Sequence, residues 1–244
     1  GSKWSGSTFA VRQGMGAYIA IFAVMIWSGR AHLREVIRQT FQIPRISQNE
    51  IISYRSAVIG LVGGMIGLTV LCSLAGLSNW VTTVVLIAFF IIALGLTWMV
   101  ANGGLLYVKQ RFRPTDYIIT VLGSNSVSND NWALLTFQDG MMRDTREMLM
   151  PNLMNSMRLP DFTNLRRHSL LLPTILSVSV TLCISAYAFL ALTYEKGGLN
   201  LETYAYVTAA IRPFDQFRRH MIAPTEASMA ESIVVVIGAG VMSG

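Results

Sequence analysis

The sequence predicts an all-α fold: a polytopic helical membrane protein with four full transmembrane helices, a truncated fifth, and an interfacial amphipathic helix on the cytoplasmic side. Of its 244 residues, 52% are apolar and 13% are charged, whereas an ordinary soluble domain carries roughly 25% charged residues. Its mean hydropathy is +0.49. Several apolar runs also approach the roughly 20 residues that cross the hydrocarbon core of a bilayer. These observations argue against a soluble domain.

The four predicted spans are residues 14–28, 57–77, 80–100 and 170–194. The first is short but can be extended at either end. A fifth apolar run, residues 233–244, stops at about two thirds of the length that a span requires. We therefore expect a single membrane domain over residues 1–244 that is one part of a longer protein.

The glycines of the terminal run, Gly238, Gly240 and Gly244, allow two interpretations. β-Branched residues followed by closely spaced glycines also begin a dinucleotide-binding turn. That turn needs a following helix, a second strand and a distant acidic residue, and Ser243 stands where its third glycine belongs. The sequence favours the start of a membrane helix, in which Gly238 and Gly240 allow close packing against another helix.

Basic residues predict the orientation, because arginine and lysine gather in cytoplasmic loops. Five arginines lie in residues 29–56, and eight basic residues lie in residues 101–168. Both connections are therefore predicted to be cytoplasmic. Residues 195–232 are predicted to be external, although they contain four basic residues. Because loop charge accounts for the net charge of +6, no nucleic-acid partner is expected.

The predicted amphipathic helix lies within the connection 101–168. Its apolar face carries Met141, Met142, Met148 and Leu149, the residues between them are largely charged, and Pro151 breaks or restarts the helix. Such a helix typically lies at the membrane interface. The alternative is a binding groove, since Met150, Met154 and Met157 extend a pliable methionine-rich surface.

No catalytic residue, metal site or cofactor site is predicted, and we expect no enzymatic activity. The predicted spans contain no Asp, Glu, Lys, Arg or His, which argues against a proton relay within them. His32, His168 and His220 are scattered, and Cys72 and Cys183 lie in apolar runs without the spacing of metal ligands. The expected partners are the lipid bilayer and other transmembrane helices, of the same protein or of a complex.

Glycines in the second span predict helix packing. Gly60, Gly64 and Gly67 share one helical face with Gly63 beside them, in overlapping GxxxG spacings. Such spacings let the backbone of another helix approach closely.

A glycine-containing break follows the third span. Asn102, Gly103 and Gly104 interrupt an apolar stretch and are followed by a second apolar piece. Transporters use such breaks to expose backbone groups to substrate, so these three residues are the candidate substrate-binding residues. The alternative, which the sequence favours, is an ordinary helix C-cap.

A family resemblance extends from about Gly14 to the end of the chain. It is carried by the blocks GMGAYIAIFAVMIWSGRAHLREV, ISYRSAVIGL, FRPTDYIITVLGS, REMLMPNLMNSMRLPD and RPFDQF. These resemble an uncharacterised family of large polytopic prokaryotic membrane proteins, a domain of unknown function that is transporter-like in size. The resemblance implies a prokaryotic cytoplasmic (inner) membrane and transfers no site residue.

Two functional hypotheses follow. The first is a transporter-like solute permease, or part of one, indicated by the glycine break and the resemblance. The second is a non-catalytic scaffold or accessory subunit of a larger membrane complex, indicated by the uncharged spans, the glycine face and the methionine-rich segment.

Overall fold

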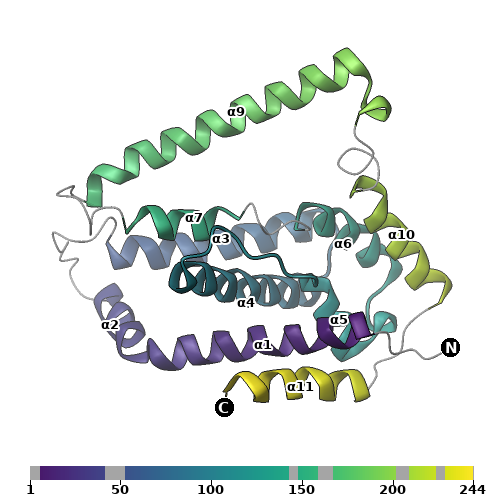
Figure 1. Ribbon diagram of the computed structural model, residues 1–244, viewed down its shortest axis with the longest axis horizontal. Helices are drawn as coiled ribbons and strands as arrows, with labels where there is room; N and C mark the ends of the chain where they lie inside the picture. The colour runs from purple at the N-terminus through teal and green to yellow at the C-terminus, as the bar shows by residue number, and fades with distance from the viewer. Residues whose placement is uncertain are drawn as a thin grey trace.

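Figure 1 shows the computed structural model, which describes residues 6–41, 53–142, 148–158, 167–201, 209–223 and 229–243. Across these ranges all regular secondary structure elements are helices. Four helices are long and apolar enough to cross a membrane: α1 (Gly6–Ser28, apolar from Phe9), α3 (Tyr54–Leu74), α4 (Asn79–Gly103) and α9 (Leu171–Lys196). The prediction of an all-α polytopic membrane protein is therefore confirmed.

Shorter helices join or flank these spans. They are α2 (Arg30–Phe41), α5 (Pro114–Leu122), α6 (Asn129–Met141), α7 (Leu149–Ser156), α10 (Ala209–Ile222) and α11 (Met229–Ser243), with 3-10 turns at Ser124–Ser126, Arg167–Leu170 and Gly198–Asn200.

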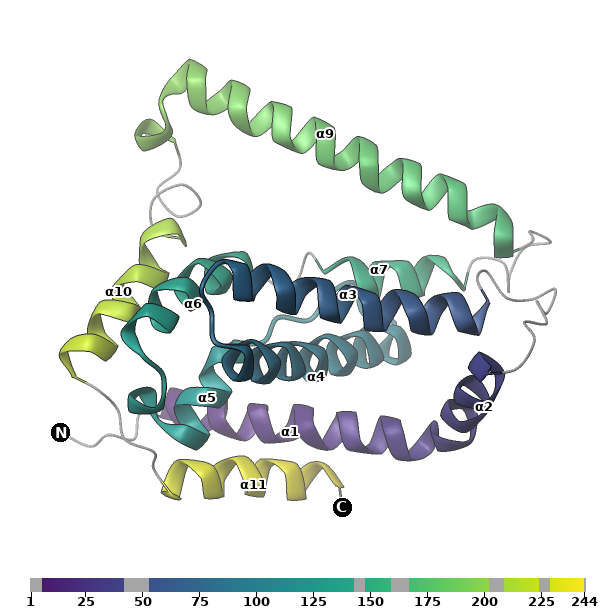
Figure 2. The same cartoon turned by 180° about the vertical axis from the view of Figure 1, so that it is seen from behind.

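The spans α1, α3 and α4 lie side by side, with α2 at one end of this bundle and α5, α6 and α10 at the other (Figures 1 and 2). The helix α11 packs along α1 more extensively than any other described pair of helices packs. By contrast, α9 stands apart, and neither α3 nor α9 has a buried residue. Apolar side chains on α3 and α9 are thus available to lipid or to further helices.

The helix α4 lies at the centre and divides the core into two clusters. One cluster surrounds Ile92 and Leu96 and includes Met15 from α1 and Phe112. The other surrounds Val81 and Val85 and includes side chains of α5 and α6. Because lipid tails are as apolar as these side chains, close van der Waals packing stabilises this core within the membrane.

The turn between α3 and α4 is fastened to α6. The Ser78 backbone N–H donates to Asn131 Oδ1 at 2.9 Å, and Asn131 Nδ2 donates to Ser78 Oγ at 2.9 Å. At the opposite end of α3, His32 of α2 packs against Tyr54 with ring centroids 5.9 Å apart. The 21 residues of α3 therefore separate α2 from α6 by about 30 Å.

This separation differs from the arrangement expected for the two connections, and their sidedness stays a prediction. Residues 29–56 and the whole of residues 101–168 were expected on one side, yet α2 and α6 lie at opposite ends of the bundle. The ten residues after α4 contain no helix and are long enough in extended form to return along the bundle.

Most of the amphipathic helix expected around residues 141–149 lies outside the described residues, and only its two ends can be compared. The helix α6 ends at Met141, and α7 begins at Leu149 with Met148 as the non-helical residue before it. Residues 143–147 lie outside the described residues. Pro151 lies in the first turn of α7, where proline is tolerated because its missing N–H would have no helical partner. Proline therefore marks a helix start here.

The terminal glycine run is helical. The helix α11 runs from Met229 to Ser243 and contains Gly238 and Gly240. A dinucleotide-binding turn would place these glycines between a strand and a helix. The membrane-helix interpretation of this run therefore agrees with the structure, and the nucleotide-binding interpretation does not.

Candidate functional site

An extended segment returns from the end of α4 toward its beginning. Residues 105–113 contain no helix, and the segment leads into α5 at the end of the bundle where α4 starts (Figure 1). The Leu105 N–H still bonds to Val100 O at 3.3 Å. For residues 106–109, no backbone hydrogen bond joins them to any other described residue.

This segment lies beside the spans at membrane depth. The Phe112 ring packs edge-on against Tyr18 with centroids 5.1 Å apart and also lies against Gly14. At 1.5 Å per residue, Gly14 and Tyr18 lie about 8 and 14 Å along α1 from Phe9. Half of a bilayer's hydrocarbon core is about 15 Å thick. Measured along α1 from Phe9, where the helix becomes apolar, Phe112 therefore lies at a depth within that half.

A groove of about 350 Å³ follows the extended segment between α1 and α4. Its walls include Tyr18, Met99 and Phe112, and its polar lining includes Lys109 and Arg111. Both cations are exposed, and neither forms an ion pair with a described residue. The groove therefore combines an aromatic wall with two cationic groups.

The extended segment ends in a charged network centred on Arg113. Pro114 occupies the first turn of α5, and Asp116 accepts a hydrogen bond from the Arg113 backbone N–H at 2.8 Å. The Arg113 side chain also donates to Asp116 Oδ1 at 3.0 Å. This local arrangement is a helix start whose acidic residue also holds the preceding arginine.

Two further helices complete the network. Arg113 Nη1 donates to Asp139 Oδ2 of α6 at 2.7 Å and also to Gln216 of α10. The Thr115 hydroxyl donates to the same carboxylate at 2.8 and 3.0 Å. The side chains of Arg113 and Asp139 are only 16% and 11% exposed. Burial lowers the pKa of Arg113, but the negative charges of Asp116 and Asp139 raise it by more. The pKa is therefore raised overall, and the guanidinium stays charged.

A second ion pair joins α1, α5 and α11. Arg12 lies 2.6 Å from Glu231, with both side chains largely buried, and it also donates to the Thr120 hydroxyl. Ser232 donates to the Thr120 carbonyl at 3.4 Å. The span that contains Arg12 begins at Phe9, earlier than the expected residue 14. Arg12 therefore lies within a span whose predicted part, residues 14–28, contains no Asp, Glu, Lys, Arg or His.

The helix α10 covers the network from outside. His220 stacks on Trp132 of α6 with centroids 5.4 Å apart, and Phe214 packs edge-on against Phe137. Burial lowers the pKa of His220, the charge of Arg113 lowers it further, and Asp116 opposes this. Protonation of His220 is thus disfavoured while α10 is docked.

The full chain, residues 1–244, matches the model of a family described as a family of unknown function (DUF6785). The chain belongs to this family. No curated protein and no solved structure matches it. The expectation of an uncharacterised family is thereby confirmed, and the site of this DUF6785 chain must be judged from its own geometry.

The predicted substrate-binding residues form the end of α4 in this DUF6785 member. Gly104 has left-handed backbone, φ 62° and ψ 25°, and its N–H bonds to Val100 O. Asn102 Nδ2 donates to Trp98 O at 3.0 Å, and Gly103 is the last residue of the helix. The cap interpretation therefore accounts for all three residues. Polar lining of the groove comes instead from residues a few positions later.

The predicted packing glycines fall into two groups. A Cβ on Gly238 would overlap the Gln13 carbonyl, and one on Gly16 would overlap the Val235 carbonyl, so α1 and α11 touch through their backbones. Gly240 has open space. Open space also surrounds all four glycines of α3, Gly60, Gly63, Gly64 and Gly67. For these, packing against a further helix stays a prediction.

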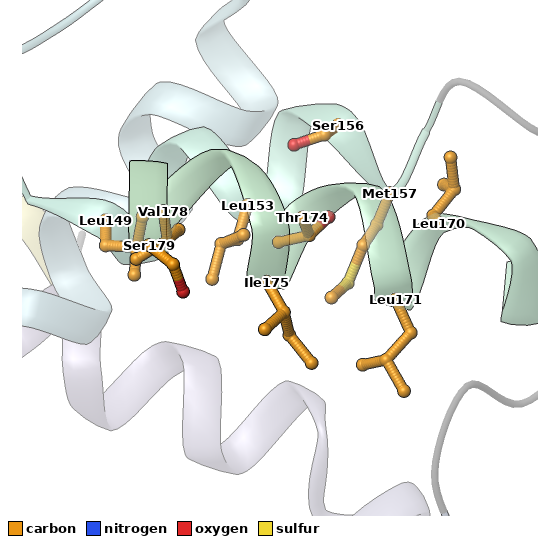
Figure 3. Close-up of a pocket in the computed structure, with 10 residues that line it drawn as sticks. All are labelled: Leu149, Leu153, Ser156, Met157, Leu170, Leu171, Thr174, Ile175, Val178 and Ser179. Atoms are coloured by element: carbon orange, nitrogen blue, oxygen red, sulfur yellow. The ribbon is translucent and has the colours of Figure 1, made fainter. Parts of the chain in front are cut away.

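The methionine-rich segment contributes to a second groove, of about 380 Å³, between α7 and the start of α9. Figure 3 shows Met157 together with Leu171 and Ile175 of α9 around it. Met150 and Met154 are exposed and do not line it. Its lining is mostly apolar, so it offers few groups that could recognise a polar solute.

Sequence reasoning missed the charged network for a definable reason. Pro114 and Asp116 form a helix-start signal that is visible in the sequence and that fixes Arg113 locally. Asp139 lies 26 positions from Arg113, and Gln216 lies 103 positions away. Side-chain periodicity carries no information on such distant pairs.

Proposed function

We propose that this chain forms part of a solute permease in a prokaryotic cytoplasmic membrane, with the groove along residues 105–112 as part of the solute path. One observation carries the proposal: backbone groups of residues 106–109 have no described hydrogen-bond partner and lie alongside membrane spans. The prokaryotic membrane rests on the family resemblance.

The physical reason is the cost of an unpaired backbone group in lipid. Each such group costs several kcal/mol in hydrocarbon, so irregular backbone at membrane depth must face protein or water. The cationic side chains of Lys109 and Arg111 on the same segment favour water over an apolar protein surface. Transporters build solute sites from such interruptions.

The charge of the groove indicates the kind of solute. Lys109 and Arg111 have no ion-pair partner among the described residues, so an anionic solute would gain attraction without breaking an existing pair. The neighbouring Arg113 is already paired with two carboxylates. The proposal therefore places solute contact at Lys109 and Arg111 and a structural role at Arg113, and it assigns no chemical reaction.

Cysteine accessibility tests the water-filled path. In a background with Cys72 and Cys183 replaced by serine, Tyr107→Cys and Lys109→Cys should react with a charged methanethiosulfonate reagent in membranes. The matched control is Leu182→Cys on α9, whose native side chain is 65% exposed and should face lipid. If the two segment cysteines react as slowly as Leu182→Cys, the proposed path is refuted.

Uptake tests transport itself. The complete gene product in proteoliposomes should accumulate at least one of glutamate, succinate and inorganic phosphate in preference to lysine. Lys109→Gln combined with Arg111→Gln should lower that uptake at least tenfold, while Asp130→Asn on the exposed surface of α6 should not. Equal uptake by the double variant and the native protein would contradict the assignment of the groove.

An accessory subunit is the second candidate. The open glycine face of α3 and the wholly exposed α9 favour it, because both offer close contact to further helices. Gly64→Leu should then release a co-purifying membrane subunit, whereas Leu61→Phe should retain it. Uptake by the reconstituted protein alone would favour the permease.

A further inference from the structure

The helix α2 is a separate feature that the permease proposal does not use. It follows α1 after a single turn residue, Gly29, and turns away from the direction of α1 at the end of the bundle (Figures 1 and 2). None of its 12 residues is buried. Two hydrogen bonds, from Gly29 to Met25 and from Leu33 to Gly29, keep the two helices nearly continuous. The position of α2 is therefore set by the span that precedes it.

The outward surface of α2 carries an apolar stripe. Leu33, Ile37 and Phe41 are spaced four residues apart and are 38, 60 and 87% exposed. Residues four apart lie on the same helical face, so these side chains form one row. On the inward side, Val36 and Gln39 are partly covered and His32 packs on Tyr54 of α3. The large apolar side chains therefore point away from the protein.

A cationic stripe lies next to the apolar one. Arg30, Arg34 and Arg38 have the same four-residue spacing and are all exposed. Within α2, only Glu35 carries negative charge, and it pairs with Arg38 at 3.0 Å. The exposed face thus presents a row of large apolar groups beside a row of guanidinium groups, which matches the boundary between acyl chains and anionic headgroups.

The end of α1 supplies an anchor at the same level. Trp27 is 71% exposed, and the Arg30 guanidinium lies 4.4 Å from its ring centroid. Tryptophan is enriched where membrane spans meet the headgroup layer. Since Trp27 ends the apolar part of α1, the level of α2 coincides with that layer.

We propose that α2 binds the headgroup layer of an anionic bilayer, with Leu33, Ile37 and Phe41 inserted among the acyl chains and Arg34 and Arg38 on lipid phosphates. The occupant is lipid, because the bilayer that surrounds α1 continues at this level and its anionic headgroups complement the arginines. Arg30 is held over Trp27 and contributes mainly by anchoring that ring.

The first measurement is depth. With Cys72 and Cys183 replaced by serine, a bimane label on Ile37→Cys is studied in nanodiscs of phosphatidylcholine and phosphatidylglycerol. Lipids brominated on their tails should quench this label strongly, and iodide in the water should quench it weakly. A label on Arg34→Cys should show the reverse balance. Strong iodide quenching and weak bromolipid quenching at Ile37 would overturn the proposal.

The second measurement is lipid preference. The purified full-length protein is titrated with fluorescent phosphatidylglycerol and phosphatidylcholine in mixed nanodiscs, with free glycerophosphate as competitor. Each arginine removed should lower the preference for phosphatidylglycerol roughly fivefold, so Arg34→Gln with Arg38→Gln should nearly abolish it. Lysine at both positions should restore it, because the attraction depends on charge.

The charge-matched control is Arg218→Gln with Arg219→Gln on α10, at the other end of the bundle, which should leave the preference unchanged. An equal loss in this control, or an unchanged preference in the α2 double variant, would refute the assignment to α2. Competition by millimolar free glycerophosphate would show a soluble-anion site instead and would also refute it.

Discussion

Asp139 provides a direct test of the charged network. Its carboxylate accepts hydrogen bonds from Arg113 Nη1 at 2.7 Å and from the Thr115 hydroxyl at 2.8 Å, and its side chain is 11% exposed. Replacement by asparagine keeps the shape but removes the charge and turns one acceptor oxygen into a donor. Asp139→Asn should therefore leave the Arg113 guanidinium with a weakened partner on its α6 side.

The expected cost follows from the burial. Removing one partner of a buried ion pair costs roughly 3–5 kcal/mol when the remaining charge has no other partner. Arg113 keeps Asp116 at 3.0 Å, so we expect about 2–3 kcal/mol for Asp139→Asn. For a chain of this length, each kcal/mol lowers the melting temperature by roughly 2–4 °C. The expected decrease is about 5–10 °C.

Thermal unfolding of the purified protein in a fixed detergent measures this decrease. Asp130→Asn is the matched control, because Asp130 lies on the same helix but is exposed; it should change stability by less than about 0.5 kcal/mol. A double-mutant cycle with Arg113→Gln should give a coupling energy of about 2 kcal/mol. If the two single effects simply add, the two side chains do not interact as described and the reasoning fails.

Three further predictions concern topology, helix packing and pH. Cysteines at Ser126 and at Arg34 should be labelled by an impermeant thiol reagent from opposite sides of the membrane, because the 3-10 turn Ser124–Ser126 lies between α5 and α6, at the opposite end of the bundle from α2; labelling from one side would contradict the arrangement. Gly238→Leu should destabilise the α1–α11 contact by several kcal/mol, whereas Gly240→Ala should be nearly neutral because its site is open; melting temperatures compare the two. His220 has a pKa below its unfolded value of 6.5, so the unfolded state binds more protons just below that pH, and stability should be full above pH 6.5 and fall as the pH drops through it; His220→Gln should remove this part of the pH dependence of the melting temperature.

The class of the protein and the number of its full spans follow from the sequence by itself. Hydrocarbon thickness sets the length of a span, and apolarity along that length is a local property of the chain. For the same reason α3, α4 and α9 were predicted to within a few residues. Gly104 as a helix cap was also predictable, since glycine adopts left-handed backbone without strain.

Structure and prediction differ where a local pattern has more than one spatial outcome. Charge counting put all of residues 101–168 on one side, because it cannot tell a loop that stays at one surface from an extended segment that crosses back. Arg12 lies outside the predicted span 14–28, whereas the apolar part of α1 begins at Phe9 and includes it. Only its pairing with Glu231, at 2.6 Å, explains how the charge is accommodated.

Tertiary structure alone decided which residues meet. Gly16 and Gly238 each lie against the backbone of the partner helix only because α11 lies along α1. The four glycines of α3 have the sequence spacing of a packing face, but their surroundings are open. Arg113 gains Asp139 of α6, which lies 26 positions further along the chain. Helical periodicity states which face of a helix is apolar; the choice of partner for that face depends on packing between distant segments, which no local pattern encodes.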